Sequence, residues 1–321
     1  MIAASHVWLL APALLLDAVV GDPDGIWRRV PHPVALLGAL VAFFDHTLNR
    51  GPARRALGIL SILVIAAIAA AIGFGFERLF DAIPFGWIGT VAVAAIFLAV
   101  RSLHDHVAAV RDAFAGGGVE TARVAVSRIV GRDPASLDEG RICRAAIEST
   151  AENFSDGVVA PALWFALLGL PGLLAYKAIN TADSMIGHMD ERHRAFGWAS
   201  ARLDDLVNLP ASRLAGALIA VAAPTAGGSI AEAFRVMVSD AGKHRSPNAG
   251  WTEAAMAAAL GLALAGPRRY AGVIVSDPFL NERGRREATP ADIGRALGVY
   301  RAANAALFAL VALVSVALWL V

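Results

Sequence analysis

The chain has 321 residues, of which 57% are hydrophobic and only 17% are charged. Its mean hydropathy of +0.59 excludes a disordered chain, and an apolar share above the roughly 45–50% of soluble domains argues against an ordinary soluble enzyme. Lys and Arg number 28 against 27 Asp and Glu, and a net charge of +1 argues against a nucleic-acid-binding protein. The single cysteine, Cys143, excludes an internal disulfide and a cysteine-rich metal site, and we expect it to be a small buried side chain.

Several apolar stretches are candidates for helices that cross a bilayer, which takes about 20 residues. Residues 57–76, 86–100 and 303–321 are the clearest, although the second is on the short side. Residues 2–20 lack the basic start and the cleavage site of a signal peptide, so we expect a retained first span. Residues 34–44 are too short to cross and are expected to lie in the membrane interface.

Three further apolar stretches are short or interrupted by Gly and Pro, namely 158–174, 214–227 and 254–265. Tilted spans, re-entrant segments and buried packing helices all fit this pattern. A full crossing by 158–174 would put the polar residues before and after it on opposite sides of the membrane. We therefore predict that 158–174 is re-entrant or packed within the bundle without crossing.

Arginine gathers in residues 21–55 and 101–156, whereas 77–85 carries only Arg78. Short loops rich in Lys and Arg stay in the cytoplasm, so we expect 77–85 to face outward. Nearly all polar residues that could take part in catalysis lie on the expected cytoplasmic side. This asymmetry favours an enzyme over a channel. The predicted fold is all-α, a polytopic integral-membrane helical bundle in which 1–321 form one domain and 101–156 and 176–213 are the main cytoplasmic catalytic segments.

The segment AIESTAENFSDG contains three acidic residues at helical spacing. Glu148, Glu152 and Asp156 recur every four residues and would share one face of a helix. Like charges at this spacing repel each other, so we expect Mg²⁺, basic side chains or solvent to compensate them. The alternative is a solvated helix face.

The segment KAINTADSMIGH would place a polar stripe on an otherwise apolar helix. The stripe consists of Asn180, Asp183, Ser184, Gly187 and His188. Oxygen ligands from Asn180 and Asp183 suit Mg²⁺, which also binds substrate phosphates. His188 is better suited to hydrogen bonding or to acid–base chemistry, and a purely structural role for it fits equally well.

The segment RLDDLVNLPASRL brings Asp204, Asp205 and Asn208 within two turns, again donors of the kind that bind Mg²⁺ and phosphate. Arg213 could clamp a phosphate or a carboxylate, and Pro210 is expected to break or to start a helix. A turn with a helix cap explains the paired acids as well.

The segment KHRSPNAGWT sets basic residues beside a polar loop, before a helix that we expect to start near Thr252. Such a loop is a plausible anion site, with a positively charged surface loop as the alternative. Asp17 at the end of the first span is either functional or interfacial. The stiff DPDG and PHP segments around His32 are best explained as loops.

The sequence lacks GxxxxGK[ST], GxSxG and HExxH, and we interpret the glycines at 116–118 as a helix break. Five segments nevertheless occur in order: LLLDAVVGDPDGIWRRVPHPV, ICRAAIESTAENFSDGVVAPALW, AYKAINTADSMIGH, FGWASARLDDLVNLPASRLAG and HRSPNAGWTEAAMAAALG. Together they resemble the integral-membrane adenosylcobinamide-phosphate synthase family of cobalamin biosynthesis. The resemblance spans nearly the whole chain, although 101–141 contribute little to it.

The resemblance implies an enzyme that joins adenosylcobyric acid to (R)-1-aminopropan-2-ol or its O-phosphate, with ATP as co-substrate and Mg²⁺ as metal. It implies an inner-membrane, multi-pass protein whose active site faces the cytoplasm, in contact with lipid and with other enzymes that assemble the nucleotide loop. The expected catalytic residues are Glu148, Glu152, Asn153, Asp183 and His188. The expected substrate- and phosphate-binding residues are His32, Lys177, Asn180, Ser184, Asn208, Arg213, Lys243, Ser246 and Asn248. The expected metal ligands are Glu152, Asp156, Asp183, Asp204 and Asp205.

Two alternatives remain at this point. A membrane prenyltransferase would use Mg²⁺ and a lipid diphosphate, although its acidic motifs usually repeat Asp every four residues. Here Gly187 and His188 follow Asp183 instead. A non-catalytic membrane assembly partner would leave the polar clusters as ordinary surface.

Overall fold

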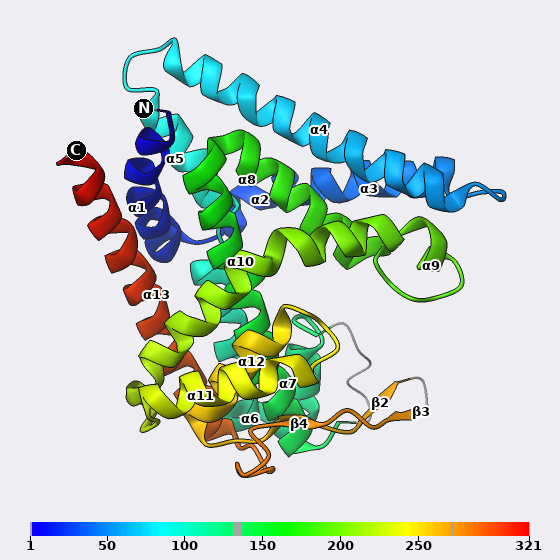
Figure 1. The fold of residues 1–321 in the computed structure, drawn as a ribbon, viewed down its shortest axis with the longest axis vertical. Helices are drawn as coiled ribbons and strands as arrows, with labels where there is room; N and C mark the ends of the chain where they lie inside the picture. Colours follow the sequence, from blue (N-terminus) through cyan, green and yellow to red (C-terminus); the bar gives the residue numbers. More distant parts are fainter. Residues whose placement is uncertain (1, 131–136, 271–272, 321) are drawn as a thin grey trace. The chain divides into compact units, whose positions relative to one another are not determined.

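The computed structural model describes residues 2–130, 137–270 and 273–320. This part of the chain is mostly helical (Figure 1). Its α-helices are α1 (Ile2–Val20), α2 (Asp24–Trp27), α3 (Pro33–Leu48), α4 (Arg54–Asp81), α5 (Trp87–Ile96), α6 (Val100–Val126), α7 (Glu139–Phe154), α8 (Ala160–Ile186), α9 (His193–Phe196), α10 (Trp198–Ala222), α11 (Ile230–Asp240), α12 (Ala249–Leu260) and α13 (Pro290–Trp319).

Shorter elements connect them. A π-helix η1 (Ser155–Val159) and two 3₁₀ turns, η2 (Ala223–Ala226) and η3 (Ala241–Lys243), extend neighbouring helices. Two small antiparallel ribbons, which the sequence did not suggest, pair β1 (Leu264–Ala265) with β4 (Phe279–Leu280) and β2 (Arg268–Tyr270) with β3 (Val273–Val275).

Five continuous helical stretches of the described chain are long and apolar enough to cross a membrane. They are Arg54–Asp81, Trp87–Val126, Glu139–Ile186, Trp198–Ala226 and Pro290–Trp319. Large apolar side chains stay exposed on two of them, for example Leu63 of α4 and Leu313 of α13, as expected for surfaces that face lipid. The prediction of an all-α, multi-pass membrane bundle is therefore confirmed.

The chain forms two compact units. Unit 1 consists of Met1–Ala99, Ala160–Asn208 and Val311–Val321, and unit 2 consists of Val100–Val159 and Leu209–Leu310. Because the two units alternate along the chain, no linker marks their boundary in the sequence.

In unit 1, two glycines of α4 allow close packing, one against α8 and one against α9. A Cβ at Gly73 would lie 2.5 Å from the carbonyl oxygen of Leu170, and a Cβ at Gly58 would lie 1.9 Å from the carbonyl oxygen of Phe196 in α9. Glycine thus allows close approach at both positions. The bend of α8 therefore lies near the Asp81 end of α4, and α9 lies near the Arg54 end.

Helix α8 changes direction sharply at Gly169, which has φ 67° and is followed by Pro171 (Figure 1). Trp164, before the bend, donates a hydrogen bond from Nε1 to the carbonyl oxygen of Val207 at 3.1 Å. Tyr176, after the bend, donates from its hydroxyl to Oδ1 of Asn208 at 2.9 Å. Twelve residues would separate these side chains by about 18 Å in a straight helix, yet they reach consecutive residues of α10. The chain therefore folds back at Gly169, and the re-entrant path of 158–174 stays a prediction.

In unit 2, α6 is interrupted at Gly118, with φ 68° and ψ −157°, which confirms the predicted break at the glycine run. Helix α7 begins after Asp138, whose Oδ1 accepts a hydrogen bond from the backbone N–H of Arg141 at 2.8 Å. Cys143 is buried in α7, as expected.

Two predicted helix boundaries are wrong. Helix α10 runs through Pro210, because the ring removes one backbone hydrogen bond that the rest of the long helix tolerates. Helix α12 begins at Ala249, so Thr252 lies in its first turn, where its hydroxyl bonds back to the carbonyl oxygen of Ala249 at 3.1 Å.

Candidate functional site

A buried carboxylate network lies in unit 1, between the second half of α8 and the first half of α10. Asp204 is 7% exposed and accepts hydrogen bonds from Nδ2 of Asn180 at 3.2 Å and from Nδ2 of Asn208 at 3.0 Å. Asn208 in turn accepts the hydroxyl of Tyr176. The fold-back of α8 is what brings Tyr176 and Asn180 against α10.

A second carboxylate, Asp183, lies one turn after Asn180 and interacts electrostatically with Asp204. A Cβ at Gly187 would lie 2.0 Å from Oδ1 of Asp183, so the glycine leaves room for this carboxylate. The structure thus brings together four residues that the sequence singled out in two separate motifs: Asn180, Asp183, Asp204 and Asn208.

The donors of this network are carboxylate and amide oxygens, the set that Mg²⁺ prefers. Among the described residues, no three His, Cys, Asp or Glu side chains are close enough to hold a metal ion by themselves. Mg²⁺ usually takes only one or two protein carboxylates and completes its shell with waters and substrate phosphates. The pair Asp183 and Asp204 fits that requirement.

The rest of the predicted stripe does not join the network. Helix α8 ends at Ile186, so His188 lies beyond the last turn, is exposed, and makes no hydrogen bond or ion pair within the described chain. The hydroxyl of Ser184 bonds back to the carbonyl oxygen of Asn180 at 2.9 Å. Asp205 pairs with Arg202 at 3.2 Å, and Lys177 is half-buried on α8.

Unit 2 assembles part of the fourth predicted cluster. Nη1 of Arg213 donates to Oδ1 of Asn248 at 3.0 Å, and its guanidinium lies over the ring of Trp251, 4.7 Å from the centroid. Ser212 also donates to Asn248, at 3.1 Å. The hydroxyl oxygen of Ser246 accepts the backbone N–H groups of Asn248 and Ala249 at the start of α12. Arginine, amide and hydroxyl groups are thus gathered at one helix start.

Lys243 is engaged elsewhere, in an ion pair of 2.8 Å with Asp240. Burial tends to raise the pKa of Asp240, but hydrogen bonds from Lys243, from the backbone N–H of Asn281 and from Ser239 outweigh it and hold that pKa below its usual value. This pair ties η3 to the segment after β4.

Of the three acids predicted to share a helix face, Glu148 and Glu152 lie on α7 and Asp156 lies on η1, and their surroundings differ. Glu148 is 5% exposed and accepts the backbone N–H of Ala265 at 2.9 Å, whereas Glu152 is exposed. Asp156 lies within the π-helix η1, whose wider turn departs from the regular four-residue spacing of an α-helix face. Asn153 donates to the carbonyl oxygen of Ser149 at 2.9 Å and to its hydroxyl at 3.0 Å.

His32 has a structural role in unit 1. Its Nδ1 accepts the backbone N–H of Val34 at 3.2 Å and so caps α3, and its Nε2 lies 3.3 Å from Asp22. The ring packs edge-on against Trp27, with centroids 4.5 Å apart. The predicted loops are therefore only partly right, because the DPDG segment leads into the short helix α2 at Asp24 and the PHP segment leads into α3 at Pro33.

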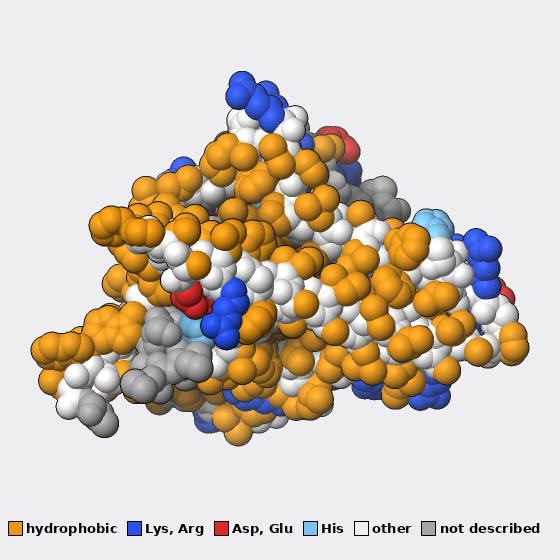
Figure 2. Space-filling view, turned by 90° about the horizontal axis from the view of Figure 1, so that it is seen from above, with side chains coloured by type: hydrophobic (Ala, Val, Ile, Leu, Met, Phe, Trp, Pro, Cys, Tyr) orange, Lys and Arg blue, Asp and Glu red, His pale blue; other side chains and the backbone are white. Residues whose placement is uncertain are grey.

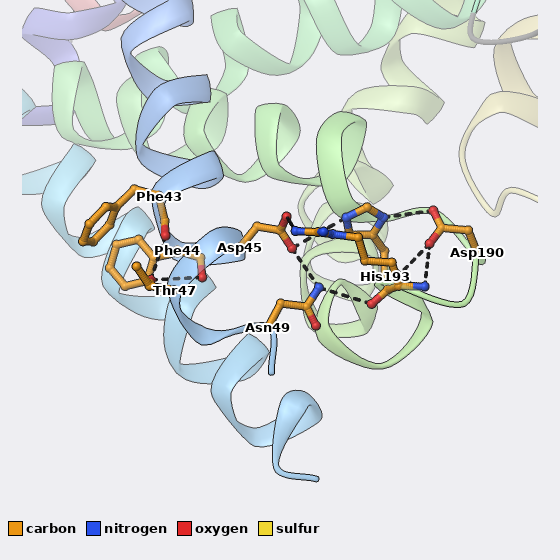
Figure 3. Close-up of polar contacts among 8 residues, drawn as sticks. Phe43, Phe44, Asp45, Thr47, Asn49, Asp190 and His193 are labelled. Atoms are coloured by element: carbon orange, nitrogen blue, oxygen red, sulfur yellow. Dashed lines mark hydrogen bonds and ion pairs between the residues drawn. The ribbon is translucent and has the colours of Figure 1, made fainter. Parts of the chain in front are cut away.

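Sequence reasoning missed a polar cluster at the end of α3 (Figure 3). Asp45 is 8% exposed and binds Arg192, Nδ2 of Asn49 at 2.8 Å and, more loosely, Nε2 of His193 at 3.6 Å. His193 also holds Asp190 at 2.9 Å. Asp45 and Arg192 are far apart in the sequence, so no local pattern could reveal the pair. The cluster anchors the loop that follows Asp183 and His188.

Comparison with known proteins gives a consistent result. The model of the CobD/Cbib protein family matches residues 10–300. Proteins named "Cobalamin biosynthesis protein CobD" are similar over most of their length: one from Sinorhizobium sp is 54% identical, covering 91% of this chain and 93% of that protein. One from Rhizobium meliloti is 53% identical over 94% of each, and one from Rhodobacter capsulatus is 46% identical over 97% and 98%. No solved structure matches. The chain belongs to the CobD/Cbib family.

Proposed function

We propose that this protein is an enzyme of cobalamin biosynthesis that joins adenosylcobyric acid to (R)-1-aminopropan-2-ol or its O-phosphate with ATP. Within a chain of this family, the observation that carries the proposal is the buried Asp204, which two amide side chains hold and which interacts electrostatically with Asp183 on the neighbouring helix. Burying a charged group costs free energy unless hydrogen bonds compensate it. An acid on the solvated surface would not need these amide partners.

The reaction needs activation because a carboxylate does not condense with an amine in water. In the first step of the proposed reaction, an oxygen of the corrin carboxylate attacks the γ-phosphorus of ATP, and ADP leaves. The amine nitrogen then attacks the acyl carbon, inorganic phosphate leaves, and one proton passes to a base. The products are the amide, ADP and phosphate, so atoms and charge balance.

Mg²⁺, when bound, would neutralise charge on the transferring phosphoryl group. Asp183 and Asp204 would hold it, with Asn180 and Asn208 keeping Asp204 in place. Arg213, Asn248 and Ser246 of unit 2 offer donors that suit a phosphate or carboxylate of a substrate. His188, exposed beyond α8, is the proposed base.

The proposal places the protein in the inner membrane, with the arginine-rich segments and the site on the cytoplasmic side. The amine and ATP then arrive from the cytoplasm. Other enzymes that assemble the nucleotide loop are the expected partners there.

The test is an activity assay on the detergent-purified protein with adenosylcobyric acid and Mg²⁺. Free aminopropanol and its phosphate are each tried with and without ATP, and the corrinoids are analysed by mass spectrometry. We expect an ATP-dependent product heavier by one dehydrated amine unit, and the productive arm identifies the amine. Folded protein that makes no product in any arm would contradict the ligase and favour the prenyltransferase or the assembly partner.

A further inference from the structure

A cavity of about 750 Å³ lies in unit 1 at the Asp81 end of α4, away from the residues assigned to ligation. Its lining combines charged or polar groups with aromatic rings, and includes His6, Trp8, Glu77, Arg78, Asp81 and Trp87. The volume falls within the range of about 300–1,000 Å³ of small-molecule sites. None of these residues was singled out from the sequence as part of a candidate site.

In the inner part of the cavity, Glu77 contacts the backbone of α8 and the ring of His6. Oε1 of Glu77 accepts the backbone N–H of Leu170 at 2.7 Å and lies 3.4 Å from Nε2 of His6. The half-buried Glu77 therefore caps the second half of α8. A Cβ at Gly169 would lie 2.0 Å from the same oxygen, so the bend itself shapes this wall.

The helix cap does not explain the other polar groups. His6 is only 8% exposed, and its Nδ1 is buried without a hydrogen-bond partner among the described residues. Arg78 turns toward the ring of Phe74, 5.1 Å from the centroid, and neither Arg78 nor Asp81 makes an ion pair within the described chain. Arg78, Asp81 and the buried Nδ1 of His6 thus border the same cavity, and none of the three has an ion-pair partner within the described chain.

Exposed aromatic side chains surround this cavity, as is typical of surfaces at the height of lipid headgroups. Trp8 and Trp87 are 43% and 53% exposed at its rim, and the neighbouring Phe85 is 75% exposed. Tryptophan collects where the bilayer meets water. Figure 2 shows a largely hydrophobic face on which acidic, basic and histidine side chains adjoin one another at its left side.

We propose that this cavity binds a molecule that carries both an ammonium group and a phosphate, as the headgroup of phosphatidylethanolamine and free phosphoethanolamine do. Asp81 and the remaining oxygen of Glu77 receive the ammonium, while Arg78 and His6 donate to the phosphate. Residues three apart on a helix have their Cβ atoms about 5–6 Å apart, so Arg78 and Asp81 fit opposite charges on one small headgroup. The proposal does not depend on the ligation reaction.

The test is native mass spectrometry of the full-length protein with equal amounts of phosphatidylethanolamine and phosphatidylglycerol. We expect the wild type to retain the ethanolamine lipid preferentially. Asp81→Asn and Arg78→Gln should each lower that preference about tenfold, or about 1.4 kcal/mol. Arg54→Gln is the control, because it removes the same charge as Arg78→Gln at the other end of α4.

A second arm uses phosphoethanolamine in water and the melting temperature in detergent. A higher melting temperature for the wild type but not for Asp81→Asn would show that the free headgroup is enough for binding. If the melting temperature does not rise but the protein still prefers the ethanolamine lipid, the lipid is the ligand. Equal retention of the two lipids, or a preference that both cavity variants keep, would overturn the proposal. An equal loss in Arg54→Gln would overturn it as well.

Discussion

At the scale of single residues, charge inside the apolar hairpin depends on hydrogen bonds. Asp204 is buried, and both of its oxygens are occupied by amide donors from Asn180 and Asn208. The same donors become a liability once the acceptor is removed, because buried amides without partners cost free energy. The network therefore links the proposed chemistry to the stability of unit 1.

Replacing Asp204 by Ala should destabilise the protein. Two amide groups lose their acceptor, at about 1–3 kcal/mol each, so the melting temperature in detergent should fall clearly below that of the wild type. Leu206→Ala is the control, since Leu206 is 61% exposed on the same helix and should change stability little. Equal melting temperatures for the two variants would show that the network contributes nothing.

Asp45 predicts a pH dependence of stability. Burial tends to raise its pKa, but hydrogen bonds from Asn49 and Arg192 and the positive charges of Arg192 and His193 outweigh it and lower that pKa. A lowered pKa means that the carboxylate stabilises the fold at all pH values above its unfolded value of 3.8, and that this contribution is lost as pH falls through the folded value.

The variant Asp45→Asn should therefore be less stable than the wild type at neutral pH. The gap between the two should shrink as acid is added below about pH 4, because the wild type alone loses a charge there. Thermal unfolding in detergent across this pH range measures it. A gap that stays constant down to pH 2 would contradict the lowered pKa.

At the scale of elements, the bend of α8 organises unit 1. It brings Tyr176 and Asn180 into contact with α10. It also lets the backbone N–H of Leu170 donate a hydrogen bond to Glu77. Only glycine accepts the positive φ of residue 169 without strain, and only glycine fits beside Glu77 and His6.

Gly169→Ala should strongly reduce the amount of folded protein and its melting temperature. The new methyl group adds backbone strain of about 1–3 kcal/mol and collides with Glu77. Gly75→Ala is a matched control on α4, because a Cβ there meets no atom within 4 Å and alanine favours a helix. If Gly169→Ala were as stable as Gly75→Ala, the bend would not be required.

Hydropathy and spacing predicted the long helices and the types of residue in the site, while long-range packing decided the rest. The apolar run in α4 and the Gly118 break are local signals. The burial of Glu148 against β1 and the pair of Asp45 and Arg192 depend on partners far away in the sequence. The passage of α10 through Pro210 likewise depends on tertiary packing that overrides a local helix breaker.

At the scale of the whole molecule, the account predicts which side of the membrane each polar segment faces. Three exposed residues suit replacement by a single cysteine: Glu152 near the end of α7, Met189 after α8, and Phe85 in the loop before α5. Because the one native cysteine is buried, a background reaction with it should be weak.

In cells, an impermeant thiol reagent should label a cysteine at 85 from outside. Cysteines at 152 and 189 should react only after the membrane is opened, because a re-entrant 158–174 leaves both on the cytoplasmic side. Labelling of 152 and 189 from opposite sides would refute the re-entrant path of 158–174. Labelling of 85 from the cytoplasm would reverse the predicted orientation.

The most direct measurement for the central claim is the rate of ATP-dependent amide formation by wild type, Asp183→Asn and Asp138→Ala, purified and assayed together. Asp138 caps α7 in a stretch that carries little of the family resemblance, so its variant should lose about 1 kcal/mol of stability and keep its turnover. Asp183→Asn should insert normally and lose at least about 100-fold in rate, as expected when a charge at the phosphoryl-transfer site is removed. Near-wild-type turnover by Asp183→Asn would contradict the assignment of this carboxylate to the active site, and no ATP-dependent product from the wild type would contradict the function itself.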